Sequence, residues 1–215
     1  MKQTSTFYAR TGKRLFDLVL TIPGLIVVFP IMLIAALLIR WNMGSPVLFR
    51  QQRPGKEEKI FTLLKFRTMN DQRDVEGKLL PDGERLTKLG RIIRKTSMDE
   101  LPQLLNVIKG DMSLVGPRPL LIRYLPYYTK EEKIRHHVKP GITGLAQLAG
   151  RNNLPWDERL SYDVQYVKRL TFFLDLKIII LTLINTFLSK NVNVNPGEKM
   201  KSLDHERSAN DSKIC

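Results

Sequence analysis

The longest uninterrupted run of hydrophobic residues lies near the N-terminus. From Leu15 to Ile39 the only polar side chains are those of Asp17 and Thr21. About 25 residues at roughly 1.5 Å each give a helix of nearly 38 Å, longer than a bilayer's hydrocarbon core of about 30 Å. The run is too long for a cleavable signal peptide, and no small-residue cleavage site follows it. The pattern therefore predicts a membrane helix.

Two features favour a re-entrant helix over a simple span. Pro23-Gly24 and Pro30 interrupt the run, and an internal proline removes a backbone hydrogen bond and bends a helix. A break at Pro30 leaves pieces of roughly 22 and 14 Å, each too short to cross a bilayer. Basic residues flank both ends, so the positive-inside rule places both ends in the cytoplasm. These residues are Lys2, Arg10, Lys13 and Arg14 before the run, and Arg40, Arg50, Arg53, Lys56 and Lys59 after it. A single transmembrane helix is the alternative.

A second apolar stretch runs from Phe172 to Leu188. Its polar residues, among them Asp175 and Thr182, fall largely on one face of a helix. Such a helix lies either in the membrane interface or in the protein core, and the sequence leaves both open.

Between the two apolar stretches the pattern predicts short strands and helices. Two strands, 47–50 and 60–66, flank a turn at 52–55, as in a β-hairpin. Helical patterns cover 85–95, 99–109, 131–138 and 157–169. Gly110 is suited to end the second of these helices. The sequence thus predicts an α+β fold that is mostly helical, with a short β-hairpin and, where the apolar stretches lie at the membrane, interfacial amphipathic helices.

Charge and cysteine content narrow the class of protein. The chain has a formal net charge of +14 and a pI near 10.0, which indicates a polyanionic partner: nucleic acid, an anionic membrane surface or a phosphorylated substrate. Its only cysteine is Cys215, so a disulfide within the chain is excluded and a reducing, cytoplasmic environment is expected. The sequence has no P-loop, dinucleotide fingerprint, zinc-protease or G-x-S-x-G motif.

Asp99 and Glu100 form an acidic pair in this basic chain. The run from Ser97 to Glu100 fits the capping box that starts a helix. A carboxylate near a helix N-terminus stays ionised, so it can act as a nucleophile or a metal ligand. The alternative is that both acids only complement the helix dipole.

Basic residues recur in turns made rigid by proline or glycine. The segments are 65–69 (Lys-Phe-Arg-Thr-Met), 116–119 (Gly-Pro-Arg-Pro) and 150–152 (Gly-Arg-Asn). An arginine held in such a turn can bind phosphate with two hydrogen bonds, although a single one more often pairs with a surface acid. Together with the acidic pair, these turns are typical of a phosphoryl-transfer site. His136-His137 is better explained as a solvated helix face than as a catalytic pair.

These blocks, with 96–104, 106–119 and 139–144, closely resemble the bacterial sugar transferase family, the monotopic polyprenyl-phosphate phosphoglycosyl transferases. The resemblance covers roughly residues 13–188. It implies transfer of a sugar 1-phosphate from a UDP-sugar to polyprenyl (undecaprenyl) phosphate, giving a polyprenyl diphosphate sugar and UMP. This is the first membrane step in the assembly of a capsule, O-antigen, exopolysaccharide or glycoprotein glycan.

The resemblance also assigns roles to residues. Asp99 is expected to attack the sugar-bearing phosphorus, to form a covalent phosphosugar intermediate and to contact Mg²⁺, with Glu100 in support. The residues expected to hold phosphates are Lys65, Arg94, Arg118 and Arg151. Pro30 matches the proline of the family's helix break, although Phe29 stands where a serine is usual.

The implied organisation is a flexible N-terminus (1–12), a re-entrant membrane helix (13–40), a cytosolic catalytic domain (41–190) and a disordered tail (191–215). The implied location is the cytoplasmic face of the bacterial plasma membrane, with the UDP-sugar, the polyprenyl phosphate and membrane lipids as partners and no nucleic acid. No residue identifies the sugar, the downstream glycan or the oligomeric state. The alternative function is a membrane-anchored basic binding module without catalysis.

Overall fold

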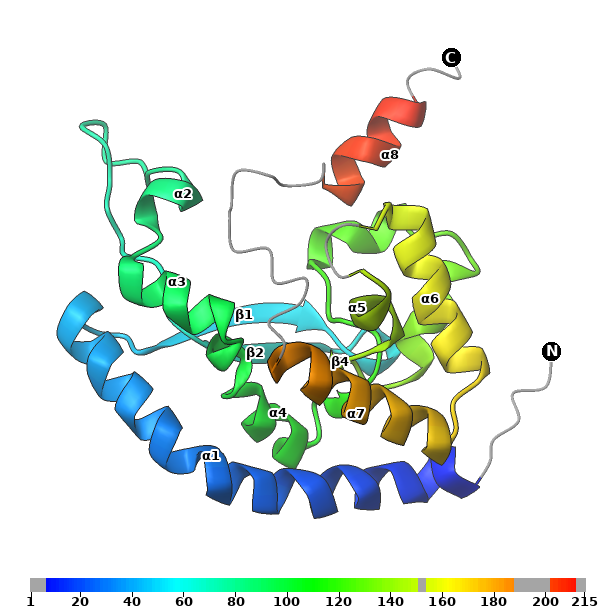
Figure 1. Ribbon diagram of the computed structural model, residues 1–215. Helices are drawn as coiled ribbons and strands as arrows, with labels where there is room; N and C mark the ends of the chain where they lie inside the picture. Colours follow the sequence, from blue (N-terminus) through cyan, green and yellow to red (C-terminus); the bar gives the residue numbers. More distant parts are fainter. Residues whose placement is uncertain (1–6, 151–153, 188–201, 212–215) are drawn as a thin grey trace.

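A computed structural model describes residues 7–150, 154–187 and 202–211 (Figure 1). Short turns of 3₁₀- or π-helix are labelled η. In chain order the elements are η1 (Tyr8–Gly12), α1 (Lys13–Met43), β1 (Leu48–Pro54), η2 (Lys56–Glu58), β2 (Ile60–Phe66), α2 (Asp82–Arg85), α3 (Lys88–Lys95), η3 (Met98–Glu100), α4 (Gln103–Lys109), β3 (Ser113–Val115), η4 (Ile122–Tyr127), η5 (Glu132–His137), β4 (Gly141–Thr143), α5 (Leu145–Ala149), α6 (Trp156–Lys168), α7 (Phe172–Phe187) and α8 (Leu203–Asp211).

Helix α1 is continuous over 31 residues and contains both Pro23 and Pro30. Figure 1 shows it bent near its middle: the first half lies beneath α4 and α7, and the second half turns toward α3. A proline removes one helical hydrogen bond and kinks the axis without ending the helix. The expected break at Pro30 is therefore wrong as an interruption of helical structure. The helix also passes the expected end at residue 40 and stops at Gly44, which has a φ of 75°.

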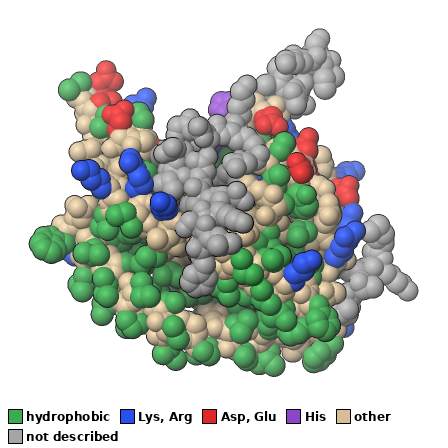
Figure 2. Space-filling view, in the orientation of Figure 1, with side chains coloured by type: hydrophobic (Ala, Val, Ile, Leu, Met, Phe, Trp, Pro, Cys, Tyr) green, Lys and Arg blue, Asp and Glu red, His purple; other side chains and the backbone are tan. Residues whose placement is uncertain are grey.

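The apolar side chains of α1 are mostly exposed. The helix that spans Tyr8–Met43 is long and apolar enough to cross a membrane, and few of its residues are buried. Figure 2 shows apolar side chains along the lower edge of the molecule, over the region of α1 and α7. Exposed apolar residues on this scale are typical of a surface that contacts a membrane or another protein.

Three polar residues in the first half of α1 are buried against the domain. Asp17 Oδ1 accepts hydrogen bonds from Ser113 Oγ at 2.9 Å and from the Leu114 N–H at 3.0 Å. Arg14 donates to the Ile108 carbonyl at the end of α4. Lys13, Asp17 and Thr21 are spaced four residues apart, so one face of the helix carries all three. This face fixes the first half of α1 to the domain.

The described residues form two small sheets of two strands each. β1 pairs antiparallel with β2, from Leu48 opposite Phe66 to Pro54 opposite Ile60, so the hairpin is confirmed. Its turn lies later than expected, because Gln52 and Arg53 are still paired and the chain reverses over 55–59. β3 pairs in parallel with β4.

Helix α7 turns Asp175 and Thr182 toward the protein. Asp175 is fully buried, and the hydroxyls of Thr143 and Thr182 lie 2.6 Å apart. Phe173 and Leu183 face outward, 80% and 54% exposed. This excludes a core helix for Phe172–Phe187 and leaves an amphipathic helix with its apolar face exposed.

Both chain ends contain more structure than the sequence indicated. Residues 8–12 form η1 and continue into α1, so the expectation of a flexible segment 1–12 is wrong there. Residues 203–211 form α8, in which Leu203 is buried and Arg207 contacts Glu132, so the expected disorder of 191–215 is wrong for this part. Residues 1–6, 191–201 and 212–215 lie outside the described residues.

Candidate active site

Asp99 and Glu100 lie in the η3 turn between α3 and α4. The expected capping box is wrong: Ser97 has a left-handed φ of 57°, and its side chain makes no capping hydrogen bond. Instead, the Glu100 N–H donates to the Ser97 carbonyl, and α4 begins at Gln103 after Pro102. Its end at Gly110 agrees with the sequence. The acidic side chains are therefore free to face the neighbouring strand and loop rather than to cap a helix.

Glu100 is held between two cations. Its Oε1 accepts from Lys65 Nζ at 2.7 Å and from Arg118 Nη2 at 2.5 Å, and the side chain is 19% exposed. Burial raises the pKa of Glu100, but the charges of Arg118 and Lys65 outweigh burial and hold it well below its usual value. Its charge in turn raises the pKa of Arg118. Glu100 is thus an anion that positions β2 and the Arg118 loop (116–121, between β3 and η4). It binds these two cations instead of capping a helix as the sequence indicated.

Asp99 is not held in this way. Among the residues that the structure describes, no donor makes a hydrogen bond to its carboxylate, and the nearest cation is Lys65 Nζ at 3.6 Å. Its side chain is 15% exposed. Burial raises the pKa of Asp99, and the charge of Lys65 offsets this in part. A carboxylate that is more basic than usual and accepts no hydrogen bond is suited to nucleophilic attack.

Arg94 approaches the site from α3. Its Nε donates to Thr68 Oγ1 at 3.0 Å, and its charge lowers the pKa of Asp99. The approach depends on Gly90, where a Cβ would lie 1.9 Å from the Thr68 carbonyl oxygen. Arg67 has a different role, since it donates to the Met43 and Ser45 carbonyls and joins the end of α1 to β2.

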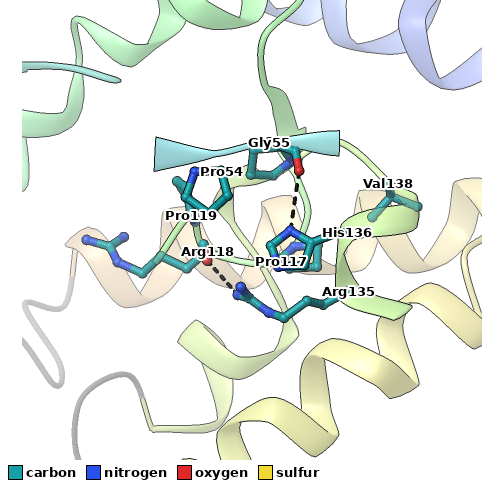
Figure 3. A pocket seen from close by; sticks show the side chains of 9 residues that line it. Pro54, Gly55, Pro117, Arg118, Pro119, Arg135, His136 and Val138 are labelled. Atoms are coloured by element: carbon teal, nitrogen blue, oxygen red, sulfur yellow. Dashed lines mark hydrogen bonds between the residues drawn. The ribbon is translucent and has the colours of Figure 1, made fainter. Parts of the chain in front are cut away.

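Arg118 is positioned through its backbone. Its carbonyl accepts from Arg135 Nη2 at 2.6 Å, and Asp163 Oδ2 holds the same guanidinium at 2.8 Å. Figure 3 shows the Arg118 side chain pointing away from the small cavity that its loop lines. The Arg135–Asp163 pair was missed by the sequence analysis, because its two members are 28 residues apart and neither belongs to a motif.

His136 lies beside this loop. The expectation of a solvated histidine pair is wrong for His136, which is 5% exposed and has Nδ1 3.3 Å from the Gly55 carbonyl oxygen (Figure 3). Burial, followed by the charge of Arg135, lowers the pKa of His136 to about 4. His137 is exposed, as expected.

The structure thus brings together Asp99, Glu100, Lys65 and Arg118, with Arg94 close enough to influence Asp99. Arg151 lies outside the described residues. Within 7–150, 154–187 and 202–211, no three His, Cys, Asp or Glu residues converge as a metal site. Mg²⁺ in phosphoryl-transfer sites is commonly bound by one or two carboxylates together with substrate phosphates. The carboxylate of Asp99, which accepts no hydrogen bond from the described residues, fits that kind of site.

Comparison with known proteins gives one family. The model of the family described as "Bacterial sugar transferase" matches residues 8–189. The chain is 57% identical to the "Uncharacterized sugar transferase EpsL" of Bacillus subtilis (strain 168), over 84% of this chain and 89% of that protein.

Two longer relatives carry names that specify a reaction. The chain is 39% identical to the "UDP-glucose:undecaprenyl-phosphate glucose-1-phosphate transferase" of Klebsiella pneumoniae, over 83% of this chain and 41% of that protein. It is 39% identical to the "Undecaprenyl-phosphate galactose phosphotransferase" of Salmonella typhimurium (strain LT2), over 84% of this chain and 40% of that protein. The chain therefore spans about four tenths of these longer relatives.

Proposed function

The chain belongs to the bacterial sugar transferase family and is therefore a transferase, and we propose that it moves a sugar 1-phosphate from a UDP-sugar to polyprenyl phosphate, releasing UMP. The names of the Klebsiella and Salmonella relatives support this donor and acceptor. The observation that carries the proposal is a contrast between the two acids. Glu100 accepts hydrogen bonds from Lys65 and Arg118, whereas the Asp99 carboxylate accepts none from the described residues and has only a longer ion pair with Lys65, at 3.6 Å.

In the proposed reaction a carboxylate oxygen of Asp99 attacks the sugar-bearing phosphorus of the donor. The bond between that phosphorus and the bridging oxygen breaks, and UMP leaves with the electron pair. The lipid phosphate then attacks the same phosphorus, which forms the polyprenyl diphosphate sugar and returns the Asp99 carboxylate. Two displacements at one phosphorus split a difficult transfer into two easier steps.

The surrounding cations supply the electrostatic part of catalysis. Lys65 and Arg118 are fixed by Glu100, so little reorganisation is needed when charge builds on the phosphoryl oxygens. Arg94 is held near the pair by Thr68. We propose Asp99 as the protein ligand of Mg²⁺, which when bound would neutralise phosphate charge. Arg151 stays a proposed phosphate ligand on the strength of the sequence motif.

Exchange of labelled UMP into the UDP-sugar, without any lipid acceptor, tests the covalent step. We expect exchange with the wild-type chain and none with Asp99→Asn, because an amide is a poor nucleophile. Glu100→Gln is the matched control: it removes the neighbouring charge but leaves the nucleophile, so weak exchange should persist. Normal exchange by Asp99→Asn, or no exchange by the wild type with its verified donor, would refute a phosphoaspartyl intermediate. A binding module would show neither exchange nor transfer.

We also propose that α1 is re-entrant at the cytoplasmic face of the plasma membrane. The exposed apolar side chains of α1 and α7, and the basic residues at both ends of α1, support this arrangement. Single cysteines at positions 10 and 56, in a Cys215→Ser background, should both resist a periplasmic thiol reagent. Labelling of one position and not the other would indicate a spanning helix.

A further inference from the structure

Two further arginines, Arg53 and Arg159, lie close enough to Arg118 to be influenced by its charge. Arg53 is the penultimate residue of β1, and the next two residues, Pro54 and Gly55, line the same small cavity as Arg118. Arg159 lies in the first turn of α6, its guanidinium 5.0 Å from the ring centre of Trp156. Neither residue takes part in the contacts of Asp99 and Glu100.

Arg53 lacks the partner that a half-buried guanidinium normally has. Its Nη2 donates to the neutral Gln51 Oε1 at 2.6 Å, and its Nε is buried without a hydrogen bond. No carboxylate among the described residues lies within ion-pair distance of it. A buried cationic donor without an anion costs free energy unless a ligand supplies the anion.

The charge of Arg118 repels both Arg53 and Arg159. Burial, followed by the charge of Arg118, lowers the pKa of Arg53 to about 10, and the same two causes lower the pKa of Arg159 to about 10. Tyr124 influences both residues and lies edge-on to Trp156 at 5.4 Å. Glu100 already pairs with Arg118, and the charge of Asp163 attracts Arg159, so Arg53 is the member of the group without an anion among the described residues. An anion placed beside Arg53 and within reach of the other two would stabilise the group.

We propose that Arg53 and Arg159 join Arg118 in a subsite for the nucleoside-bearing phosphate of the donor, the group that leaves as UMP. This proposal rests on the proposed function. When the bond between the sugar-bearing phosphorus and the bridging oxygen breaks, that oxygen keeps the electron pair. The phosphate of UMP thereby gains one negative charge. Arginines placed around it stabilise that charge as it forms.

The position in the fold favours the nucleotide over the lipid phosphate. In Figure 1 the first turn of α6 lies at the far side of the domain from α1 and the apolar edge. A polyprenyl phosphate has to reach the site from that apolar edge, whereas a water-soluble nucleotide can enter from the opposite side. The subsite therefore faces the donor.

Binding of UMP to the full chain in detergent micelles tests the subsite by calorimetry. We expect Arg53→Gln and Arg159→Gln each to weaken UMP binding about tenfold, because each removes a charge-assisted phosphate contact. Arg50→Gln is the matched control, since Arg50 lies in the same strand, is exposed and points to the opposite face. Uridine, which lacks the phosphate, should bind with the same affinity to the wild type and to the three variants.

Three results would overturn the subsite. The first is that Arg53→Gln and Arg159→Gln bind UMP as tightly as Arg50→Gln does. The second is that these two variants lose affinity for uridine and for UMP to the same extent. The third is that they raise the KM for polyprenyl phosphate and leave the affinity for UMP unchanged. If Arg53→Gln does not fold, Arg53→Lys and Arg159→Gln carry the test. UMP binding requires no transfer step, so absence of exchange with intact UMP binding would refute only the covalent mechanism.

Discussion

Lys13 of α1 and Asp175 of α7 form a buried ion pair, with Nζ and Oδ2 2.6 Å apart across 162 residues of sequence. The same carboxylate accepts hydrogen bonds from the hydroxyls of Tyr8 and Tyr166, at 2.6 and 2.8 Å. The pair joins the two helices whose apolar side chains are exposed. It therefore holds the proposed membrane surface in a fixed orientation to the domain.

Asp175→Asn should destabilise the protein by about 3–5 kcal/mol, because it removes the carboxylate that is paired with the buried Lys13 ammonium. The melting temperature in detergent measures this effect. The matched control is Glu131→Gln, which breaks an ion pair with Lys168 of the same 2.6 Å length at the surface. Exposed pairs contribute about 0–1 kcal/mol, so the control should change little. Equal shifts for the two variants would contradict a special role for the buried pair.

Gly90→Ala should lower both stability and UMP exchange. The added Cβ would lie 1.9 Å from the Thr68 carbonyl oxygen, so α3 has to move away and the Arg94–Thr68 hydrogen bond is lost. Overpacking of this kind typically costs about 1–3 kcal/mol, or more. Gly83→Ala is the control, since nothing lies within 4 Å of its added Cβ. Exchange at the wild-type level in Gly90→Ala would show that the position of Arg94 does not matter.

The elements that the sequence predicted correctly are those set by local pattern. The apolar run of α1, the β1–β2 hairpin and the glycine that ends α4 each depend on residues close together in the chain. The apolar face of α7 was predicted too, but its direction was left open, because only the contacts of Asp175 and Thr182 show which face meets the protein.

The parts that the sequence could not supply are set by distant contacts. Glu100 fits a capping motif, yet Lys65 and Arg118 form stronger charge-assisted bonds with it than a backbone N–H would. His136 lies in a basic, polar run but is buried by the hairpin turn at Gly55. Arg207 lies in a polar tail and is fixed by Glu132 from an element 75 residues earlier. Local periodicity contains no information about such partners.

His136 should make the folded protein less stable as the pH falls below neutral. Its pKa is about 4 in the folded state and near 6.5 when unfolded, so between these values the unfolded chain binds the extra proton. The loss amounts to at most about 3 kcal/mol by pH 4. His136→Asn keeps a donor for the Gly55 carbonyl but cannot be protonated. Melting temperatures at pH 7.5 and 5 should therefore fall less for the variant than for the wild type. An equal fall in both would exclude His136 as the cause.

The fall of kcat/KM on the acid side of its pH profile (the acid limb) should follow the protonation of Asp99. Burial raises its pKa above the usual 3.8, and attack requires the ionised carboxylate, so kcat/KM should fall at a higher pH than an exposed aspartate would give. Lys65 opposes this shift, being 3.6 Å from the carboxylate. Lys65→Gln should therefore lower the rate and also move the acid limb to higher pH. Lys59→Gln, at an exposed lysine one residue before β2, should change neither. A lower rate in Lys65→Gln with an unmoved acid limb would mean that the ionisation controlling the rate is not that of Asp99.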